Sequence, residues 1–386
     1  MHCKCYSSIT EIPAKLWDEL FSTENPFVQH AFLLALEQSS CVSTQTGWQA
    51  RHMMVLDENR PVAVMPLYAK IHSYGEFVFD WGWAEAYERH GLDYYPKLIT
   101  AIPFSPVAGP RIGISTEAEP DEIIPVLLGA VRQLAKSNSY SSWHLLFPGL
   151  RLQKALVAMK DEESFLHREA VQFHWFNHDY HTFDDFMSSL RSARRKNLKR
   201  ERRRVAEQGI TLQRKTGADI GDEEWQGFYR CYMDTYQKRS GHDGYLNRKF
   251  FDQLRATMAD QLMLVIARCD NEIVACSLFL FDHRRLYGRY WGALRDISCL
   301  HFEACFYQGI EFCIEHGLQE FDPGTQGEHK LMRGFEPVKS ASYHWIADSR
   351  FRVAIADFLE REKRGTDDYQ QQARAYLPYR KDINKD

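Results

Sequence analysis

The same order of predicted elements occurs twice in this 386-residue chain, and a repeated order constrains a fold more strongly than any single motif. In the first half, two short helices precede three strands, predicted at 17–21, 32–37, 51–56, 62–71 and 76–81. In the second half, two helices again precede three strands, predicted at 225–236, 250–258, 262–268, 273–281 and 286–293. Each half then continues with a helix, at 123–136 or 300–314, and with a strand closed by Pro-Gly, at 148–149 or 323–324. This pattern indicates an internal duplication and a pair of similar α/β domains.

The second copy contains a stretch, from 286 to 335, that places many polar side chains at the ends of elements. Apolar residues recur at helical spacing from Leu300 to Ile314, Ser298 can cap the start of this helix, and Gly317 suits a left-handed residue at its end. Pro323 lacks an amide hydrogen, so we expect 325–333 to be a loop. Loops held by rigid elements often carry function. The polar residues of this loop are Gln326, Glu328, His329, Lys330 and Arg333.

Composition limits the class of protein. The chain is 44% hydrophobic and has a formal net charge of only −4, so no global charge marks it as a nucleic-acid protein. Its nine scattered cysteines, an odd number without framework spacing, favour a reducing compartment. The N-terminus has no apolar core of signal-peptide length, and the longest apolar runs are strand-sized. We therefore expect a soluble cytoplasmic protein.

A dense basic run, RSARRKNLKRERRR, occupies 191–204 and contains nine Lys or Arg and one Glu, which gives a local charge of 9 − 1 = +8. One interpretation is a binding surface for the phosphates of RNA, a nucleotide-sugar or a cofactor. The other is a solvated basic helix that links two domains. The expected anion-binding residues are Arg194, Arg195, Lys196, Lys199 and Arg200. The expected domains are 1–180 and 211–386, with the basic linking helix at 181–210.

Long strings along the chain resemble the FemAB-like family of peptidoglycan biosynthesis and recognition, which belongs to the larger GNAT-like acyltransferase group. The strings are RSARRKNLKRE at 191–201, LHFEACFYQGIEFCIEHGLQEFDPG at 300–324, GEHKLMRGFEPV at 327–338, NPFVQHAFLLALE at 25–37, SYGEFVFDWGWAEAYERHGLDYYPKL at 73–98, PFSPVAGPR at 103–111 and HWIADSRFRVAIADFLERE at 344–362. They cover nearly the whole chain. The resemblance implies an α/β fold with mixed sheets and two tandem GNAT-like (acyl-CoA N-acyltransferase-like) domains.

The resemblance also implies a transferase. Relatives of the Fem type transfer an aminoacyl group from aminoacyl-tRNA to an amine of a peptidoglycan precursor. This chain has no long helical arm inserted in a domain, and it has no Gln/Arg-x-x-Gly-x-Gly/Ala loop of the kind that holds the pyrophosphate of CoA. The donor, aminoacyl-tRNA or acyl-CoA, therefore stays open. The expected function is an acyl or aminoacyl N-transferase acting on a small-molecule or peptide amine. The alternatives are a non-catalytic GNAT-like module that binds a cell-wall precursor or RNA, and a CoA-dependent N-acetyltransferase acting on a small amine.

Aminolysis of an ester or thioester needs a neutral attacking amine, a donor for the developing oxyanion and a proton for the leaving group. The expected catalytic residues are Asp322, Glu328, His329 and Glu303. The expected substrate-binding residues of the second domain are Arg289, Tyr290, Gln326, Lys330 and Arg333. Asp322 also suits an Asp-Pro-Gly turn, and Glu328 and His329 also suit a plain surface loop. His301 is expected to cap or pack rather than to catalyse.

In the first domain, an aromatic stretch could form a wall for a sugar or a base, although aromatic residues more commonly form core. Its members are Asp80, Trp81, Trp83, Tyr87, Tyr94 and Tyr95. Lys97 and Arg111 flank it and could hold a carboxylate or a phosphate, with surface ion pairing as the alternative. His301 and Glu303 are not followed by Pro-Cys-x-x-Cys, and the cysteines lack the spacing of a zinc cluster, so no metal site is predicted.

Overall fold

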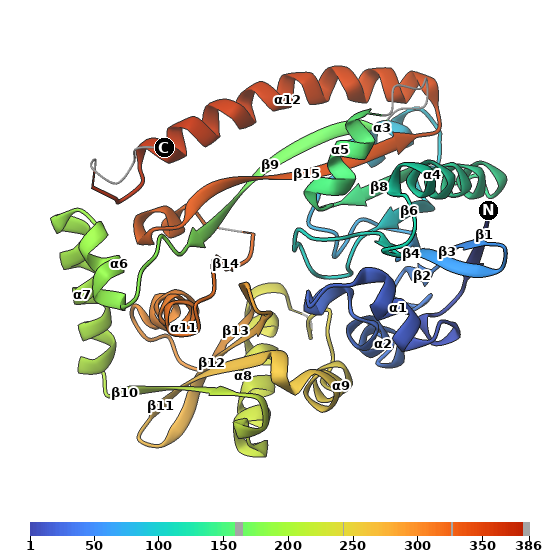
Figure 1. Cartoon of the computed structure of the whole chain (residues 1–386). Coiled ribbons are helices and arrows are strands. Elements are labelled where there is room, and N and C mark those ends of the chain that lie inside the picture. The colour runs from blue at the N-terminus through green and yellow to red at the C-terminus, as the bar shows by residue number, and fades with distance from the viewer. Residues whose placement is uncertain (159–164, 242, 326, 381–386) are drawn as a thin grey trace. The chain divides into compact units, whose positions relative to one another are not determined.

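The computed structural model of the chain describes residues 1–158, 165–241, 243–325 and 327–380 (Figure 1). It forms two compact units. Unit 1 consists of Met1–Ala170 and Lys339–Asp367, and unit 2 consists of Val171–Val338 and Asp368–Asp386. This division differs from the predicted domains because Lys339–Asp367 lies in unit 1, and because the basic helix predicted to link the domains lies within unit 2. The chain passes between the units inside β9 (Leu166–Phe176), β15 (Glu336–Ile346) and α12 (Ser349–Ala375).

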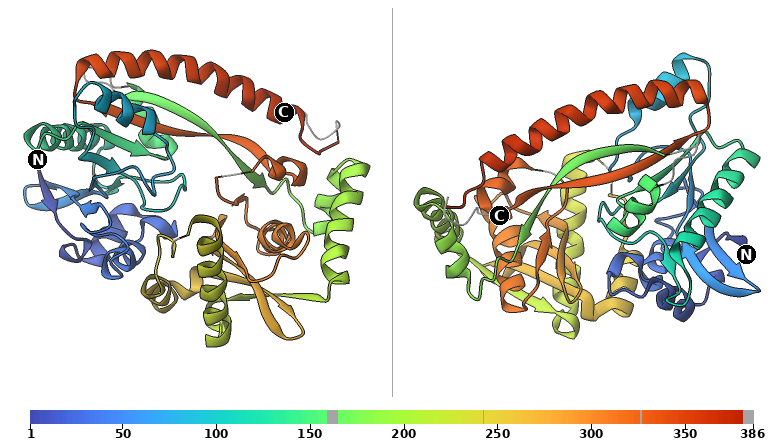
Figure 2. Two further views of the ribbon diagram at one scale, coloured as in Figure 1. Left: turned by 180° about the vertical axis from the view of Figure 1, so that it is seen from behind. Right: turned by 45° about the horizontal axis from the view of Figure 1, so that its top comes forward.

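Unit 1 contains two sheets. The smaller has the strand order β1–β3–β4–β7, with β1 at His2–Tyr6, β3 at His52–Asp57, β4 at Arg60–Met65 and β7 at Gly113–Ile114. The other has the order β9–β15–β8–β6–β5–β2, with β8 at Ser142–Leu146, β6 at Lys97–Thr100, β5 at Tyr68–Lys70 and β2 at Trp48–Ala50. Strands β6 and β8 are parallel and their neighbours are antiparallel, so this sheet is mixed. Figure 2 shows the two long strands β9 and β15 side by side.

Each helix of unit 1 buries apolar side chains in the core. They are α1 (Ala14–Phe21), α2 (His30–Gln38), α3 (Trp81–Arg89), α4 (Pro120–Ser137), α5 (Leu150–Ala158) and the first part of α12. In α4, Ile124, Leu127, Leu128 and Val131 recur at helical spacing and all lie in the core with β3 and β8. The helices predicted at 17–21, 32–37 and 123–136 are therefore confirmed.

Two strand predictions in unit 1 are wrong. The strand predicted at 62–71 is interrupted at Pro66, and its two parts, β4 and β5, belong to different sheets. No strand forms at 76–81. Gly75 has φ +81° and Phe77 has φ +62°, which are values that an extended strand does not adopt, and α3 begins at Trp81. A strand was predicted here because aromatic residues are enriched in strands, and this segment is rich in them.

Unit 2 contains a sheet of order β10–β11–β12–β13–β14–β9. Its other strands are β10 (Ile210–Thr216), β11 (Leu262–Cys269), β12 (Glu272–Phe281), β13 (Arg285–Ala293) and β14 (Glu320–Asp322). Strands β13 and β14 are parallel, and the remaining pairs are antiparallel. The predicted strands at 262–268, 273–281 and 286–293 are confirmed.

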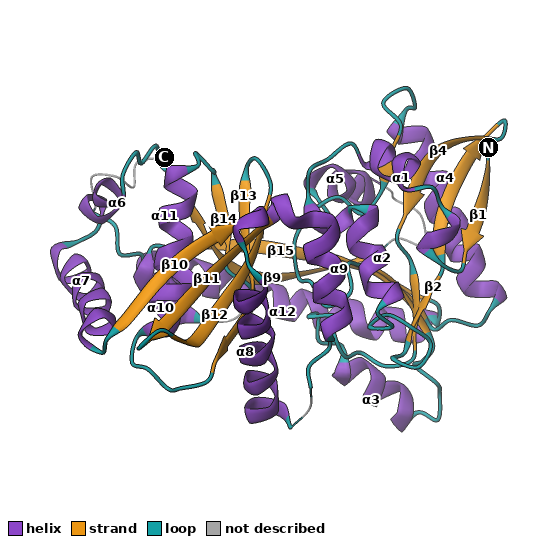
Figure 3. Ribbon diagram, turned by 90° about the horizontal axis from the view of Figure 1, so that it is seen from below, coloured by secondary structure: helices purple, strands orange, loops and turns teal. Residues whose placement is uncertain are grey.

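Helices cover both faces of this sheet. The helices of unit 2 are α6 (Phe183–Ser189), α7 (Ser192–Glu207), α8 (Asp222–Ser240), α9 (Arg248–Met258), α10 (Leu300–Phe302) and α11 (Gln308–Glu315). Figures 1 and 3 show α8 and α11 at this sheet. Consecutive residues of β12 point to its two faces, because Cys276 contacts Cys231 of α8, whereas Ser277 accepts a hydrogen bond from Cys305, between α10 and α11. The predicted helices at 225–236 and 250–258 are confirmed.

The helix predicted at 300–314 is also confirmed, with two local differences. Its middle, Glu303–Tyr307, is a π-helical turn, and its N-cap is Cys299 rather than Ser298. The loop predicted at 325–333 contains a short 3₁₀ helix, Glu328–Arg333, which lies between Gly327 and Gly334, both with positive φ. Within the described ranges, no helix has the length and hydrophobicity needed to cross a membrane.

Candidate functional site

The end of β14 in unit 2 carries a buried ion pair. Arg289 donates to Asp322 Oδ2 at 2.5 Å, and the backbone amide of Gly324 donates to Asp322 Oδ1 at 2.9 Å. Arg289 is the extra residue of a β-bulge, since Leu278 pairs with Tyr290 but Phe279 pairs with Gly288. A bulge re-aims a side chain, and here it coincides with the side chain that meets β14. Burial would raise the pKa of Asp322, but Arg289 and His174 outweigh it and lower this pKa to about 2.

Lys330 lies beside this ion pair. Its side chain is only 2% exposed, and its Nζ donates to the carbonyl oxygen of Gly324 at 2.5 Å. Burial lowers the pKa of Lys330 to about 8, against the opposing influence of Asp322. The Gly324 residue therefore links both groups, because its amide binds Asp322 and its carbonyl binds Lys330. A buried lysine whose pKa lies close to neutral can exchange a proton during a reaction.

The neighbouring residues of the 3₁₀ helix differ in their surroundings. His329 is at the surface, and its ring lies 5.6 Å from the rings of both Phe302 and Phe306. Partial burial, Arg333 and Lys330 lower the pKa of His329, so its imidazole is neutral at pH 7. Glu328 is exposed and accepts a hydrogen bond from Tyr369 at 2.8 Å. The expected substrate-binding residue Gln326 lies outside the described residues.

Glu303 and Arg333, two further expected site residues, belong to ion pairs with α7. Arg202 donates to both oxygens of Glu303 at 3.0 Å, and Arg333 donates to Glu201 Oε1 at 2.7 Å. Tyr307 donates to Glu201 as well, and the Arg333 guanidinium lies 3.4 Å from the centre of the Phe302 ring. These contacts attach α7 to the π-helical turn. Glu303 is buried, and its carboxylate is held by the Arg202 guanidinium.

The surface of α7 outside its buried apolar contacts is cationic. Leu198 and Val205 are buried, whereas Lys196, Lys199 and Arg200 are exposed. Six cations of this helix have no ion pair within the described part of the chain, namely Arg194, Arg195, Lys196, Lys199, Arg200 and Arg204. This surface, which we call the α7 cationic face, contains all five residues expected to bind anions.

His174 of β9 is not among the site residues predicted from the sequence. Its Nδ1 lies 2.7 Å from Glu320 Oε1, and its Nε2 lies 3.8 Å from Asp322 Oδ1. No local pattern marks this residue, because it reaches β14 only through the antiparallel pairing of β9 with β14. Tyr290 was expected to bind substrate. It is buried against α8 and α9, with its ring 5.2 Å from that of Phe251 and 5.9 Å from that of Tyr232.

Unit 1 contains a separate buried polar cluster around Lys97. The fully buried Nζ donates to Ser73 Oγ at 2.8 Å, to Glu76 Oε2 at 2.8 Å and to Asp80 Oδ2 at 2.5 Å. Tyr94 also donates to Asp80 Oδ2, at 2.6 Å. These contacts use all three protons of the Lys97 ammonium. The Lys97 charge therefore pairs with protein carboxylates, and no proton of its ammonium is left to donate to an anionic ligand. Lys97 and Asp80 are among the site residues predicted from the sequence, whereas Glu76 and Ser73 are not.

The expected aromatic wall of unit 1 separates into core and surface. Trp83 and Tyr87 are buried and pack with Phe351, Ile355 and Leu359, as the core interpretation expects. Trp81 is 40% exposed, and Tyr95 is half-buried and bonds Ser73 Oγ at 2.8 Å. Arg111 is buried and donates to the carbonyl oxygens of Val107, Pro110 and Leu146. Burial lowers its pKa to about 9, and its contacts hold loops of unit 1 together.

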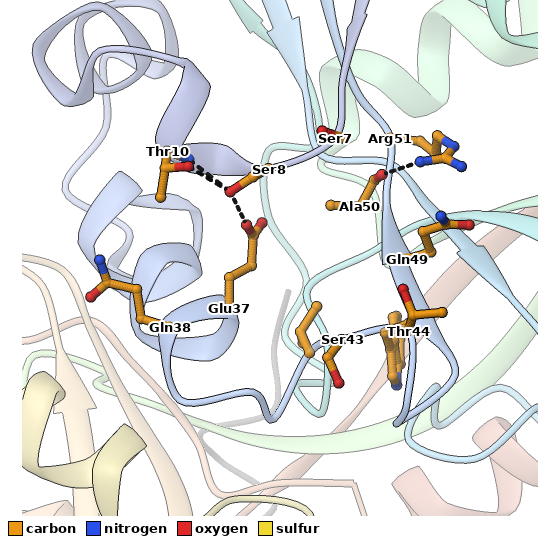
Figure 4. A pocket seen from close by; sticks show the side chains of 12 residues that line it. Ser7, Ser8, Thr10, Glu37, Gln38, Ser43, Thr44, Gln49, Ala50 and Arg51 are labelled. Carbon is orange, nitrogen blue, oxygen red and sulfur yellow. Dashed lines mark hydrogen bonds between the residues drawn. The ribbon is translucent and has the colours of Figure 1, made fainter.

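Unit 1 also has an open polar cavity of about 410 Å³ near α2 and β2 (Figure 4). Glu37 points toward Ser8, whereas Ser43 and Thr44 lie on the opposite wall. The Glu37 carboxylate accepts hydrogen bonds from Ser8 Oγ at 2.7 Å and from the Ile9 amide, and it lies 2.8 Å from His52 Nε2. Protein groups therefore already satisfy this carboxylate. The residues described include no group of three or more His, Cys, Asp or Glu side chains able to hold a metal ion.

Comparisons with known proteins agree with this architecture. FemX is 13% identical and matches with a TM-score of 0.54, over 92% of this chain and all of its own length. The C-terminal domain of a putative lysylphosphatidylglycerol synthetase from Agrobacterium fabrum is 10% identical, with a TM-score of 0.52 over 92% of this chain and 96% of its own. A conserved protein of unknown function from Bacteroides thetaiotaomicron is 12% identical, with a TM-score of 0.50 over 89% and 99%. The expected fold, mixed α/β with two tandem GNAT-like domains, is confirmed.

The family of the chain follows from a comparison of its sequence with protein-family models. No curated protein matches the chain. A model of the FemAB-like family, described as peptidoglycan biosynthesis/recognition, matches residues 8–381. This match covers nearly the whole sequence, including the 3₁₀ helix, the π-helical turn and the Lys97 cluster described above. The chain belongs to the FemAB-like family.

Proposed function

We propose that this protein transfers an aminoacyl or acyl group to an amine, and that unit 2 catalyses the transfer around Lys330. The family is one of peptidoglycan biosynthesis and recognition, so the proposed acceptor is a peptide amine of a peptidoglycan precursor. The observation that carries the proposal is the buried ammonium of Lys330, which shares Gly324 with the Arg289–Asp322 pair. Two cationic donors and one neutral imidazole in adjacent positions are the groups that aminolysis requires.

In the proposed reaction, the acceptor nitrogen bonds to the acyl carbon, and the bond from that carbon to the donor oxygen or sulfur breaks. One proton must leave the nitrogen, and one must reach the departing atom. His329 is neutral at pH 7, so we assign it the first proton. Lys330 is protonated below about pH 8, so we assign it the donation to the departing atom. Solvent then returns the proton from His329 to Lys330, and no net proton is gained or lost.

Asp322 receives a different role from the one the sequence suggested. A carboxyl group with a pKa of about 2 stays ionised and is a weak base at pH 7. We therefore propose that it positions Arg289, whose guanidinium stabilises the oxyanion that develops on the acyl carbonyl. Glu303 is proposed to position the π-helical turn through Arg202, because its two oxygens already accept from that guanidinium. For Glu328 we propose only a contact to substrate at the surface.

Aminoacyl-tRNA is the proposed donor. The α7 cationic face supports it, because six cations without acidic partners suit a polyanion better than a single small ligand. An acyl-CoA donor carries far fewer charges, and it remains the alternative that the assay below includes. Since charged tRNA is cytoplasmic, the proposal places the reaction in the cytoplasm.

The test is a transfer assay with the full-length protein. Radiolabelled aminoacyl-tRNAs and acyl-CoAs are each offered with amine acceptors, including a peptidoglycan precursor peptide, and amide formation is measured. We expect transfer from aminoacyl-tRNA, and we expect Lys330→Met to reduce kcat by a factor of about 10² to 10⁴, the usual contribution of a general acid. The matched control is Lys238→Met, which removes an exposed lysine of α8. Equal loss in both variants would contradict the role of Lys330, and transfer from acyl-CoA alone would contradict aminoacyl-tRNA as the donor.

A further inference from the structure

The Lys97 cluster of unit 1 leaves two buried carboxylate oxygens without a partner. Glu76 and Asp80 each use one oxygen for Lys97, and the other oxygens, Glu76 Oε1 and Asp80 Oδ1, accept no hydrogen bond within the described residues. The two residues are 4% and 2% exposed. Leaving a buried acceptor unsatisfied costs about 1–3 kcal/mol and more when it is charged, so such oxygens indicate that a further donor belongs there.

The charges of the cluster point to the kind of donor. Lys97 is one permanent cation against two carboxylates, and their combined influence keeps its pKa raised despite burial. Burial lowers the pKa of Lys70 to about 7, so this second lysine is only partly charged at neutral pH. Burial also lowers the pKa of His144 to about 3, and it keeps His344 neutral as well. Burial raises the pKa of Glu76 to about 7 as well, so when Glu76 is ionised and Lys70 is neutral, two carboxylates face one ammonium and the cluster can accept one more positive charge.

The loop that carries these carboxylates also exposes aromatic rings. Tyr74 is 57% exposed, and the centre of its ring lies 4.9 Å from that of Trp81, with the two ring planes inclined at 61°. Ile71 and Phe79 on the same loop are exposed too. Large apolar side chains at the surface of one loop mark a contact site when they occur together. Aromatic faces attract alkylammonium groups as well as apolar chains.

We propose that loop 71–81 binds a ligand that carries a primary ammonium group on an apolar stem. Glu76 Oε1 and Asp80 Oδ1 accept from the ammonium, and Tyr74 and Trp81 contact the stem. The cluster already holds one –NH₃⁺ group, that of Lys97, between the same two carboxylates. A divalent ion such as Ca²⁺ requires six or more oxygen ligands, which this cluster does not offer. Both oxygens are buried, so the proposed ligand reaches them only when loop 71–81 moves.

Three probes of equal length test the charge requirement, namely butylammonium, butan-1-ol and butyrate. Each is titrated into the full-length protein without any acyl donor, and Kd is measured by calorimetry and by NMR of the Trp81 indole. We expect butylammonium to bind at least tenfold more tightly than the other two. At pH 7 its binding releases protons, because Glu76, whose pKa burial raises to about 7, becomes fully ionised. Butan-1-ol or butyrate binding as tightly as butylammonium would overturn the proposal.

Two variants localise the site. Glu76→Gln keeps the shape of the side chain but removes its charge, and we expect it to weaken butylammonium at least tenfold. Glu85→Gln, an exposed residue of α3, is the matched control and leaves Kd unchanged. If Glu76→Gln does not fold, Trp81→Leu decides, because Trp81 is at the surface. The loss of a cation–π contact should weaken butylammonium two- to fivefold. Wild-type affinity in the folded variants would overturn the proposal. Since no donor is present, this outcome leaves the proposed transfer untouched.

Discussion

At the scale of single residues, Lys330 gives the proposed reaction a distinctive pH dependence. Its pKa is about 8, so the ammonium that donates a proton is present below this pH and is lost above it. We therefore expect kcat to fall as the pH rises through about 8. Lys330→Arg keeps its charge at all these pH values, so the falling limb should disappear or move above pH 10 while some activity remains. The measurement is a pH–rate profile of kcat for the two proteins.

The control for this profile is Lys238→Arg, which changes an exposed lysine outside the cluster and should keep the wild-type limb near pH 8. A limb that stays near pH 8 in Lys330→Arg would show that another group titrates there. A purely structural role for Lys330 would instead lower kcat equally at every pH, without moving the limb.

The residues of this cluster were only partly predictable from sequence. Asp322 and Lys330 stand out because they are polar and lie near predicted element ends, and Arg289 stands out as a charged residue within a predicted strand. What links them is invisible in the sequence, since Arg289 meets Asp322 through a bulge and His174 meets it from β9. Similarly, Lys97 looked like an anion-binding residue. Its two carboxylate partners lie 17 and 21 positions earlier, and only the fold brings them together.

At the scale of elements, β8 and β15 place two histidines opposite each other in the core of unit 1. His144 and His344 are directly paired in register, with their Nδ1 atoms 2.5 Å apart. Both have a lowered pKa in the folded protein, because burial disfavours the imidazolium. Below pH 6.5 the unfolded chain binds protons that the folded chain does not, so stability is full above pH 6.5 and declines as the pH falls.

The prediction concerns the slope of this decline. Each such histidine contributes about 1.4 kcal/mol per pH unit to the free energy of unfolding between about pH 6 and 4. His344→Gln removes one of them, so its stability profile should be flatter than the wild-type profile by about that amount. Urea unfolding at a series of pH values measures both profiles. His181→Gln, at an exposed position, should keep the wild-type slope, and an unchanged slope in His344→Gln would contradict the interpretation.

The α7 helix is the second element with a measurable property. If its cationic face contacts phosphates, changing Lys196, Lys199 and Arg200 to Gln removes three contacts. The slope of log K against log salt for total tRNA should then become shallower by about 2 to 3, since each contact contributes roughly 0.7–0.9. The measurement is fluorescence anisotropy of labelled tRNA at salt concentrations from about 50 to about 300 mM.

The control for the helix is a matched triple change on α12, at Arg361, Lys363 and Arg364, which are exposed cations of unit 1. This protein has the same net charge as the α7 variant, so it separates a local surface from a general charge effect. Equal slopes in the two triple variants would show that the α7 cationic face is a solvated helix surface, as the second interpretation of the basic run holds.

Elements were predicted best where alternation or helical spacing was long. The strands β11, β12 and β13 and the helix after them follow such patterns and are confirmed. The third strand of the first half fails because Gly75 and Phe77 adopt positive φ, which a count of aromatic residues does not detect. The break at Pro66 has a visible signal, the proline itself, yet only the fold shows that the chain changes sheets there.

At the scale of the whole molecule, unit 1 is built from two segments of chain. Lys339–Asp367 supplies Ala341, Tyr343 and Trp345 to the main core of unit 1, and Phe351, Ile355 and Leu359 to its smaller core. Burial of such side chains contributes about 1.5–3 kcal/mol each, so together they match the whole stability of a typical domain. A domain boundary near 180 therefore leaves the first domain incomplete, although it follows the repeat in the sequence.

This organisation predicts which fragment of the chain folds. Residues 1–180 alone keep β6 but lack β15, the other strand that pairs with β8, so they should show no cooperative unfolding transition. Residues 1–170 joined through a short Gly-Ser linker to 339–367 should unfold cooperatively, because Ser340 Oγ lies only 3.4 Å from the Ala170 carbonyl oxygen and the linker need span little distance. Thermal unfolding followed by near-UV circular dichroism compares the two proteins. A cooperative transition in 1–180, or none in the joined protein, would contradict the two-segment core, because the first result makes Lys339–Asp367 dispensable and the second makes it insufficient.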